Sequence, residues 1–169
     1  MKQLLIVWHS RTGAARQMAQ AAARGAAAAA ADLEQADELR VEIRRAPDAD
    51  ADVLLASQGF LFCAPENLAS LSGEMKEFFD RNYYAVLDRI QGLPYASMIS
   101  AGSDGSGAAR QVERICTGWR LSAVAPALIV NMGAQTAAQI LAPKIVATPD
   151  LARCEELGGL LAGMMLMGA

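Results

Sequence analysis

The feature that most constrains the fold is an apolar run at residues 4–8 that stops abruptly at a short polar segment, 9–13, before an alanine-rich stretch. This pattern predicts a buried strand, a tight loop and the N-terminus of a helix. Ser10 and Thr12 offer hydroxyl groups, Gly13 lets backbone N–H groups come close to an anion, and the helix N-terminus adds a positive partial charge. The same residues also fit an ordinary turn in which Ser and Thr cap a helix. Both interpretations stand until the other segments are considered.

The rest of the chain alternates between strand-like and helix-like segments. We expect strands at residues 4–8, 39–44, 59–63, 95–101 and 127–131. We expect helices at residues 14–31, 52–57, 73–87, 108–119 and from 149 onward, with Ser72 and Thr148 as caps and 133–147 mostly as loop. Apolar strands alternating with helices predict an α/β fold of three layers, doubly wound around a five-stranded parallel sheet in the order 2-1-3-4-5, in one domain over residues 1–169.

The patterns within single segments add detail. The alternating residues of 39–44 predict a half-buried strand near an edge of the sheet. Met18, Ala22 and Gly25 share one face of the first helix, where small side chains would let it sit close to the sheet. The last helix carries an apolar stripe made up of Leu151, Cys154, Leu157, Leu161 and Met164.

Three polar loops, at 9–14, 64–68 and 101–107, follow the first, third and fourth expected strands. In the 2-1-3-4-5 order these strands are neighbours, and they flank the point where the strand order reverses. Ligands of such sheets bind beyond the carboxyl ends of the strands at that point. The three loops together therefore predict a small-molecule site.

The overall composition excludes several classes of function. The formal net charge of -3 leaves no broad basic surface for nucleic acid or an anionic membrane. The N-terminal apolar run is too short for a signal peptide, and the apolar C-terminal segment is too short to span a bilayer. Cys63, Cys116 and Cys154 show no metal-ligand spacing, so we expect reduced, mostly buried thiols and a cytoplasmic protein.

Several catalytic motifs are absent from the sequence. The spacing of Gly102, Gly105 and Gly107 does not fit GxGxxG, and neither GxxxxGK[ST] nor GxSxG occurs. His9 could hold a proton near a cofactor, or it could simply pack at the edge of its loop. Glu66 could act as an acid or base, or it could shape its turn.

Three of the loops, and the helix after the second of them, resemble motifs of a known family. The segment 10–15, Ser-Arg-Thr-Gly-Ala-Ala, resembles the flavodoxin phosphate loop S/T-x-T-G-x-T. The segment 64–68 with 71–81 is similar to T-P-x-x-x…M-S-G-x-x-K-x-F-x-D, and 100–105 corresponds to the second ring-binding loop of the same family. The family comprises flavodoxin-like FMN proteins: flavodoxins, NAD(P)H-dependent FMN reductases and flavodoxin-like quinone reductases.

This resemblance implies a flavodoxin-like fold and a set of cofactor-binding residues. The FMN phosphate would be bound by Ser10, Arg11, Thr12, Gly13, Ala14 and Ala15. One side of the isoalloxazine ring would be lined by Pro65, Glu66, Asn67 and Leu68. Its pyrimidine end would meet Ala101, Gly102, Ser103, Asp104 and Gly105. The resemblance implies no metal and no catalytic side chain, because flavin N5 carries the chemistry.

The departures from the family pattern suggest which branch the chain is closest to. Ala14 and Ala15 replace polar residues, so their phosphate contacts would come from the backbone alone. The 64–68 loop has no aromatic residue and the chain is only mildly acidic, which favours a reductase over a carrier. We therefore expect hydride transfer from NAD(P)H through FMN to a quinone, free flavin or other small acceptor. A one-electron carrier and a non-catalytic binding module are the alternatives.

The resemblance also bears on assembly. Relatives often pair subunits across the flavin face, so we expect a homo-oligomer, a dimer or a tetramer. The apolar last helix is consistent with such an assembly. We expect no nucleic-acid partner and no membrane-spanning segment.

Overall fold

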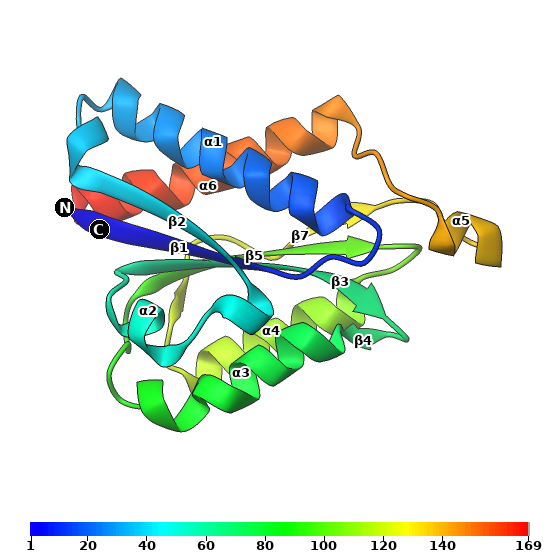
Figure 1. Cartoon of the computed structure of the whole chain (residues 1–169). Helices are drawn as coiled ribbons and strands as arrows, with labels where there is room; N and C mark the ends of the chain where they lie inside the picture. Colours follow the sequence, from blue (N-terminus) through cyan, green and yellow to red (C-terminus); the bar gives the residue numbers. More distant parts are fainter. Residues whose placement is uncertain (169) are drawn as a thin grey trace.

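The computed structural model describes residues 1–168 and contains a parallel sheet between two layers of helices (Figure 1). The strands of the sheet are β1 (Lys2–Trp8), β2 (Leu39–Arg45), β3 (Gly59–Asn67), β5 (Pro94–Ala101), β6 (Ser122–Ala123) and β7 (Leu128–Asn131). Their order is β2-β1-β3-β5, and both β6 and β7 then pair with β5. This arrangement confirms the predicted order 2-1-3-4-5, with β2 at an edge.

The fifth position of the sheet differs from the expectation of one strand at 127–131. It is shared by β6 and β7, and the chain between them includes Pro126. Proline has no N–H to donate to the ladder, so an interruption at this edge position has a local cause. The four residues of β7 pair in register with the C-terminal half of β5, from Met98 to Ala101.

The helices cover the sheet on both faces. They are α1 (Ala14–Asp32), α2 (Ala51–Leu55), α3 (Gly73–Val86), α4 (Ser106–Gly118), α5 (Ala137–Leu141) and α6 (Thr148–Met167), with short 3-10 turns at Ala36–Glu38 and Ala46–Asp48. Helices α1 and α6 lie on one face, and α2, α3 and α4 lie on the other (Figure 1). Leu5 and Val7 of β1 point into one hydrophobic cluster and Leu4 and Ile6 into the other. All four are fully buried, as a strand covered on both faces requires.

The small residues of α1 serve helix–helix packing more than packing on the sheet. A Cβ added at Gly25 would lie 1.9 Å from the backbone oxygen of Glu155 in α6. A Cβ added at Gly158 would lie 2.0 Å from the backbone oxygen of Ala22 in α1. The expectation that Gly25 brings α1 close to the sheet was therefore wrong, since its closest neighbour is α6.

Two expected loops contain regular structure. The segment expected as loop at 64–68 is mostly strand, because β3 continues to Asn67 and turns back into β4 (Ser70–Leu71), which pairs with it in antiparallel fashion. The segment 133–147 contains α5, which Thr136 and Gln139 begin with a capping box.

The observed helix boundaries differ slightly from the expected ones. Helix α4 begins at Ser106 rather than 108, and α6 has Ala147 at its N-cap in place of Thr148. Ser72 is the N-cap residue of α3, but its side chain does not cap the helix. In the core stripe of α6, Met165 is buried where Met164 was expected. Within residues 1–168, no helix combines the length and the apolar character needed to cross a bilayer.

The contact between α1 and α6 gives a test with a matched control in one helix. Gly158→Ala should lower the free energy of unfolding by about 1–3 kcal/mol, because its methyl group meets the backbone of α1. Gly163→Ala should raise it by about 0.5–1 kcal/mol, since the nearest atom to its Cβ is the flexible end of Met167 at 3.9 Å. Urea denaturation measures both. Equal effects of the two substitutions would contradict the described packing.

Candidate functional site

Three of the predicted site segments meet at one edge of the sheet. Strands β1, β3 and β5 are adjacent and parallel, so the segments after them begin at the same side. Figure 1 places the end of β1, the β3–β4 hairpin and α5 at this end of the molecule. The strand order reverses between β1 and β3, which is where ligands bind to sheets of this kind.

The N-terminus of α1 is open. Its N-cap is Gly13, whose φ of 99° favours glycine, and no side chain caps the helix. The Ser10 Oγ accepts a hydrogen bond of 3.0 Å from the Gly13 N–H, so the hydroxyl can still donate its own proton. There is no acidic residue in the first turn. The end of α1 therefore offers backbone N–H groups and positive partial charge to an anion.

The alanines of this turn contribute through their backbone. Ala14 and Ala15 are buried and belong to the hydrophobic cluster under α1 and α6. Their methyl groups thus point into the core, and only their backbone groups face the start of the helix.

Gln17 braces the loop against a distant part of the chain. Its Nε2 donates to the backbone oxygens of Gly13 (2.9 Å) and Lys144 (2.8 Å), and its Oε1 accepts from the Val146 N–H (3.1 Å). The Lys144 N–H donates to the Thr12 oxygen at 2.8 Å. The segment 144–146 therefore holds the shape of the loop before α1.

The N-terminus of α4 has the same backbone conformation at its N-cap as that of α1, but a carboxylate of the protein occupies it. Its N-cap is Gly105, with φ of 90°. The carboxylate of Glu66 accepts hydrogen bonds from Gly105 N–H (2.9 Å) and Ala108 N–H (3.1 Å). A carboxylate at a helix N-terminus is favourable. The Glu66 side chain thus ties the end of β3 to α4, and only its backbone is free to face a ligand.

The β3–β4 hairpin has a strained turn. Leu68 and Ala69 have φ of 52° and 59°, in a region that residues with side chains rarely adopt. The Leu68 side chain is fully exposed at 101%. A Cβ added at Gly107 would lie 2.2 Å from the Ala69 oxygen, so the hairpin packs directly on the start of α4.

The loop 101–105 is held by the segment after β7. The Met132 N–H donates to the Ala101 oxygen (2.7 Å), and the Ala134 N–H donates to the Gly102 oxygen (2.9 Å). The Asn131 side chain donates to the Ser103 oxygen. The two expected ring-binding segments are thus positioned by contacts from β7 and α4.

His9 lies between the first loop and α3. Its Nδ1 is 2.9 Å from the Ser72 Oγ, and its Nε2 is 3.4 Å from a carboxylate oxygen of Glu74. Burial lowers the pKa of His9 below its ordinary value of 6.5, against the smaller opposing effect of Glu74. Its side chain is only 11% exposed. These contacts favour a positioning role for His9 over proton transfer to a ligand.

One groove lies next to the first loop, and a second cavity lies farther away. A groove of about 740 Å³, which we call the Arg45 groove, opens between α1 and the ends of β1 and β2, and Trp8, Arg16, Ile43 and Arg45 are among its lining residues. Three of these lining residues, Arg16, Ile43 and Arg45, were not among the predicted site residues. The alternation of apolar and charged residues in β2 could have indicated the last two, because it places Ile43 and Arg45 on one face of the strand.

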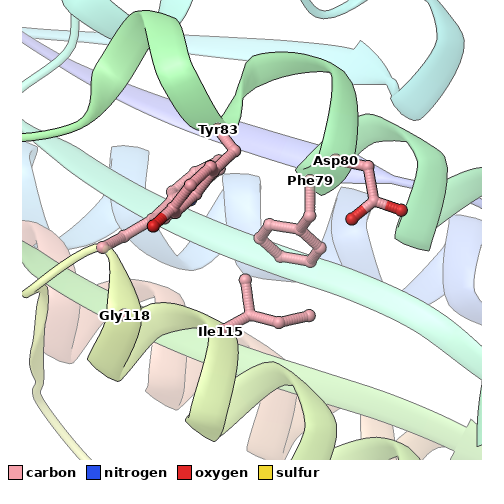
Figure 2. A pocket seen from close by; sticks show the side chains of 6 residues that line it. Phe79, Asp80, Tyr83, Ile115 and Gly118 are labelled. Carbon is pink, nitrogen blue, oxygen red and sulfur yellow. The ribbon is translucent and has the colours of Figure 1, made fainter.

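The second cavity is smaller and apolar. Figure 2 shows Phe79, Tyr83 and Ile115 around it, with Asp80 at one side. Its volume is about 150 Å³, and it lies between α3 and α4 towards their C-terminal ends. Helices in this fold run antiparallel to the strands, so the cavity is remote from the carboxyl ends of β1, β3 and β5. Within residues 1–168, no three His, Cys, Asp or Glu gather as a metal site would need, and the three cysteines are buried and free, as predicted.

Comparison with known proteins identifies the fold. Neither protein-family models nor curated protein sequences match this chain. Among solved structures, an oxidoreductase from Corynebacterium diphtheriae superposes with a TM-score of 0.76 at 19% identity, covering 100% of this chain and 99% of the other. A flavodoxin from the domain Archaea gives 0.75 at 17% identity, covering 97% and 99%. A WrbA-like flavodoxin from Agrobacterium tumefaciens gives 0.69 at 17% identity, covering 100% of both.

The chain has a flavodoxin-like fold. The likeness extends over essentially the whole length of these structures, and it agrees with the strand order given above. In the flavodoxin-like arrangement, the open end of α1 and the two tied segments at 64–68 and 101–105 surround the switch point of the sheet.

The state of His9 can be tested directly, because it is the only histidine. An NMR titration of its ring protons should give a pKa below 6.5, and Glu74→Gln should lower that pKa further. In the unfolded chain His9 has its ordinary pKa, so near pH 6 the unfolded chain binds more protons than the folded chain. The free energy of unfolding should therefore fall as the pH drops from 6.5 through the pKa of folded His9. A pKa of His9 at or above 6.5 would contradict the burial described here.

Proposed function

We propose that this chain is an FMN-binding oxidoreductase that uses NAD(P)H and a small-molecule electron acceptor. The observation that carries the proposal is the uncapped N-terminus of α1, which lies at the switch point of a flavodoxin-like sheet. A phosphate monoester dianion suits that position, because it satisfies N–H groups that the helix itself cannot pair.

The residues at this edge fit FMN. Ser10, Arg11, Thr12, Gly13, Ala14 and Ala15 would bind the phosphate, the first and third through their hydroxyls and the others mainly through backbone N–H groups. Within the described chain, the Thr12 hydroxyl makes no hydrogen bond, so it is available to a ligand. Side-chain donors and the helix dipole would act together on the same phosphate.

The ring would lie against the two tied segments. Pro65 to Leu68 would face one side of the isoalloxazine, and Ala101 to Gly105 would meet its pyrimidine end. The Glu66 carboxylate acts as a positioning group, since it fixes both segments through Gly105 and Ala108. When bound, FMN would supply the chemistry of accepting a hydride and passing electrons on to the acceptor.

A reductase is favoured over a one-electron carrier by the composition of the ring-binding segment. Residues 64–68 contain no aromatic side chain to cover the flavin, which leaves a face open to a hydride donor and acceptor. The acceptor would be a quinone, a free flavin or another small molecule.

Assembly and location are further parts of the proposal. Leu68, Leu141 and Ile145 are large apolar side chains with exposures of 101%, 77% and 87%. Exposed apolar side chains of this kind favour contact with another subunit, so we propose a homo-oligomer. We propose a cytoplasmic location from the buried free thiols.

FMN binding can be tested by fluorescence titration of the purified protein. Gly13→Ala should weaken FMN binding by about tenfold or more, because alanine strains a φ of 99° and the loop must change shape. Gly92→Ala is the matched control: its φ is 78°, nothing lies within 4 Å of the added Cβ, and it precedes β5 at the opposite edge. It should leave FMN affinity unchanged.

Two outcomes would contradict this proposal. A protein that takes up no FMN would refute it outright. A protein that binds FMN but oxidises neither NADH nor NADPH with any quinone or flavin acceptor would refute the reductase activity and favour the carrier.

A further inference from the structure

The Arg45 groove lies on the side of the first loop away from the ring-binding segments. Its walls come from the first two turns of α1, from the C-terminal ends of β1 and β2, and from the first loop, where Ser10, Arg11 and Gly13 line both this groove and the proposed phosphate site. Strand β2 is at the edge of the sheet, and β3 and β5 lie on the other side of β1. A ligand in this groove would therefore lie away from the proposed ring site and next to the loop proposed to bind the FMN phosphate.

The register of the sheet explains which side chains enter the groove. Trp8 pairs with Arg45, and Ile6 pairs with Ile43. Ile6 and Trp8 belong to the face of β1 that packs under α1, so Ile43 and Arg45 of the parallel partner point to the same face. Arg16 comes from the opposite wall, in the first turn of α1. The lining thus combines an aromatic and an aliphatic side chain with two guanidinium groups, one from α1 and one from β2.

The charge of the groove is opposite to that of the whole chain. Its lining includes Arg11, Arg16 and Arg45 but no acidic residue, although the chain has a formal net charge of -3. Arg16 makes no ion pair within residues 1–168. The Arg45 Nε is 4.0 Å from the nearest Asp48 oxygen, which is beyond hydrogen-bond length. Both guanidinium groups can therefore bind an anion without giving up a strong partner.

We propose that the Arg45 groove binds the phosphomonoester of a nucleoside, with the phosphate between Arg16 and Arg45 and the base against Trp8 and Ile43. Guanidinium groups bind phosphate oxygens in pairs, and aromatic rings stack on bases. A volume of about 740 Å³ is that of a small-molecule site and much exceeds the needs of a phosphate ion. The ligand is either the adenosine 2′-phosphate end of NADPH, which rests on the proposed function, or a free nucleotide.

Calorimetric titration of the FMN-loaded protein tests this proposal with three probes: adenosine 2′,5′-bisphosphate, 5′-AMP and inorganic phosphate. We expect the bisphosphate or 5′-AMP to bind at least about tenfold more tightly than inorganic phosphate, because only they have a base. Tighter binding of the bisphosphate identifies NADPH as the source, and tighter or equal binding of 5′-AMP identifies a free nucleotide. Equal binding of inorganic phosphate, or no binding of any probe, would overturn the proposal.

Substitutions locate the bound probe. Arg45→Gln and Arg16→Gln should each weaken nucleotide binding by about tenfold. Arg44→Gln is the matched control, because it removes the same charge from the next position of β2, where Arg44 pairs with Glu42 at 2.7 Å. It should change the affinity by less than about threefold. Binding that ignores Arg45→Gln would place the nucleotide elsewhere and overturn the proposal.

The same titrations separate this proposal from the proposed function. If FMN binds and the nucleotides do not, the groove proposal fails and the proposed function stands. If FMN does not bind, the titrations are run on the protein alone; binding that is sensitive to Arg45→Gln and Arg16→Gln but not to Arg44→Gln then supports the groove while the proposed function fails. Binding that disappears when FMN is loaded would place the nucleotide phosphate at α1 and overturn the groove proposal.

Discussion

The two helix N-termini at one edge of the sheet differ in whether a side chain of the protein occupies them. Both α1 and α4 begin after a glycine with positive φ, so their backbone ends are alike. Glu66 fills the end of α4 with a carboxylate, whereas the end of α1 has no cap and no acidic residue. Unpaired N–H groups at a helix end favour an anion, and this is why we propose the start of α1 as the position of the phosphate.

The open end is kept in shape by residues far away in the sequence. Gln17 bonds to both Gly13 and Lys144, and Lys144 in turn bonds to Thr12. The close packing of α1 on α6, which depends on Gly25 and Gly158, fixes the helix that carries this loop. The loop before α1 and the layer that contains α1 and α6 are thus held in place through the same helix.

Much of the fold could be predicted from the sequence, because it depends on local patterns. The apolar runs of β1 and β3 and the alternation of β2 specify their burial, and the order of the elements specifies a parallel sheet. The hairpin after β3 could not be predicted, since Leu68 and Ala69 adopt a turn that their types disfavour. Helix α5 did have a local signal in Thr136 and Gln139, but it is only five residues long.

For the site, the sequence predicted which segments meet but not how their side chains are used. The contact of Glu66 with α4 joins residues about 40 positions apart, so no local pattern could predict it. The Arg45 groove depends on the register between β1 and β2, and this register could not be predicted from the sequence. Contacts between side chains far apart in the sequence are thus the feature of the site that the sequence did not predict.

An amide NMR titration of the protein with FMN tests whether the start of α1 binds the phosphate. We expect large changes in amide chemical shift at residues 11–15, together with changes in the segments proposed to contact the ring, and much smaller changes at Ala108, whose N–H group already bonds to Glu66. Changes that centre on the start of α4 and leave residues 11–15 unaffected would contradict the proposed position of the phosphate.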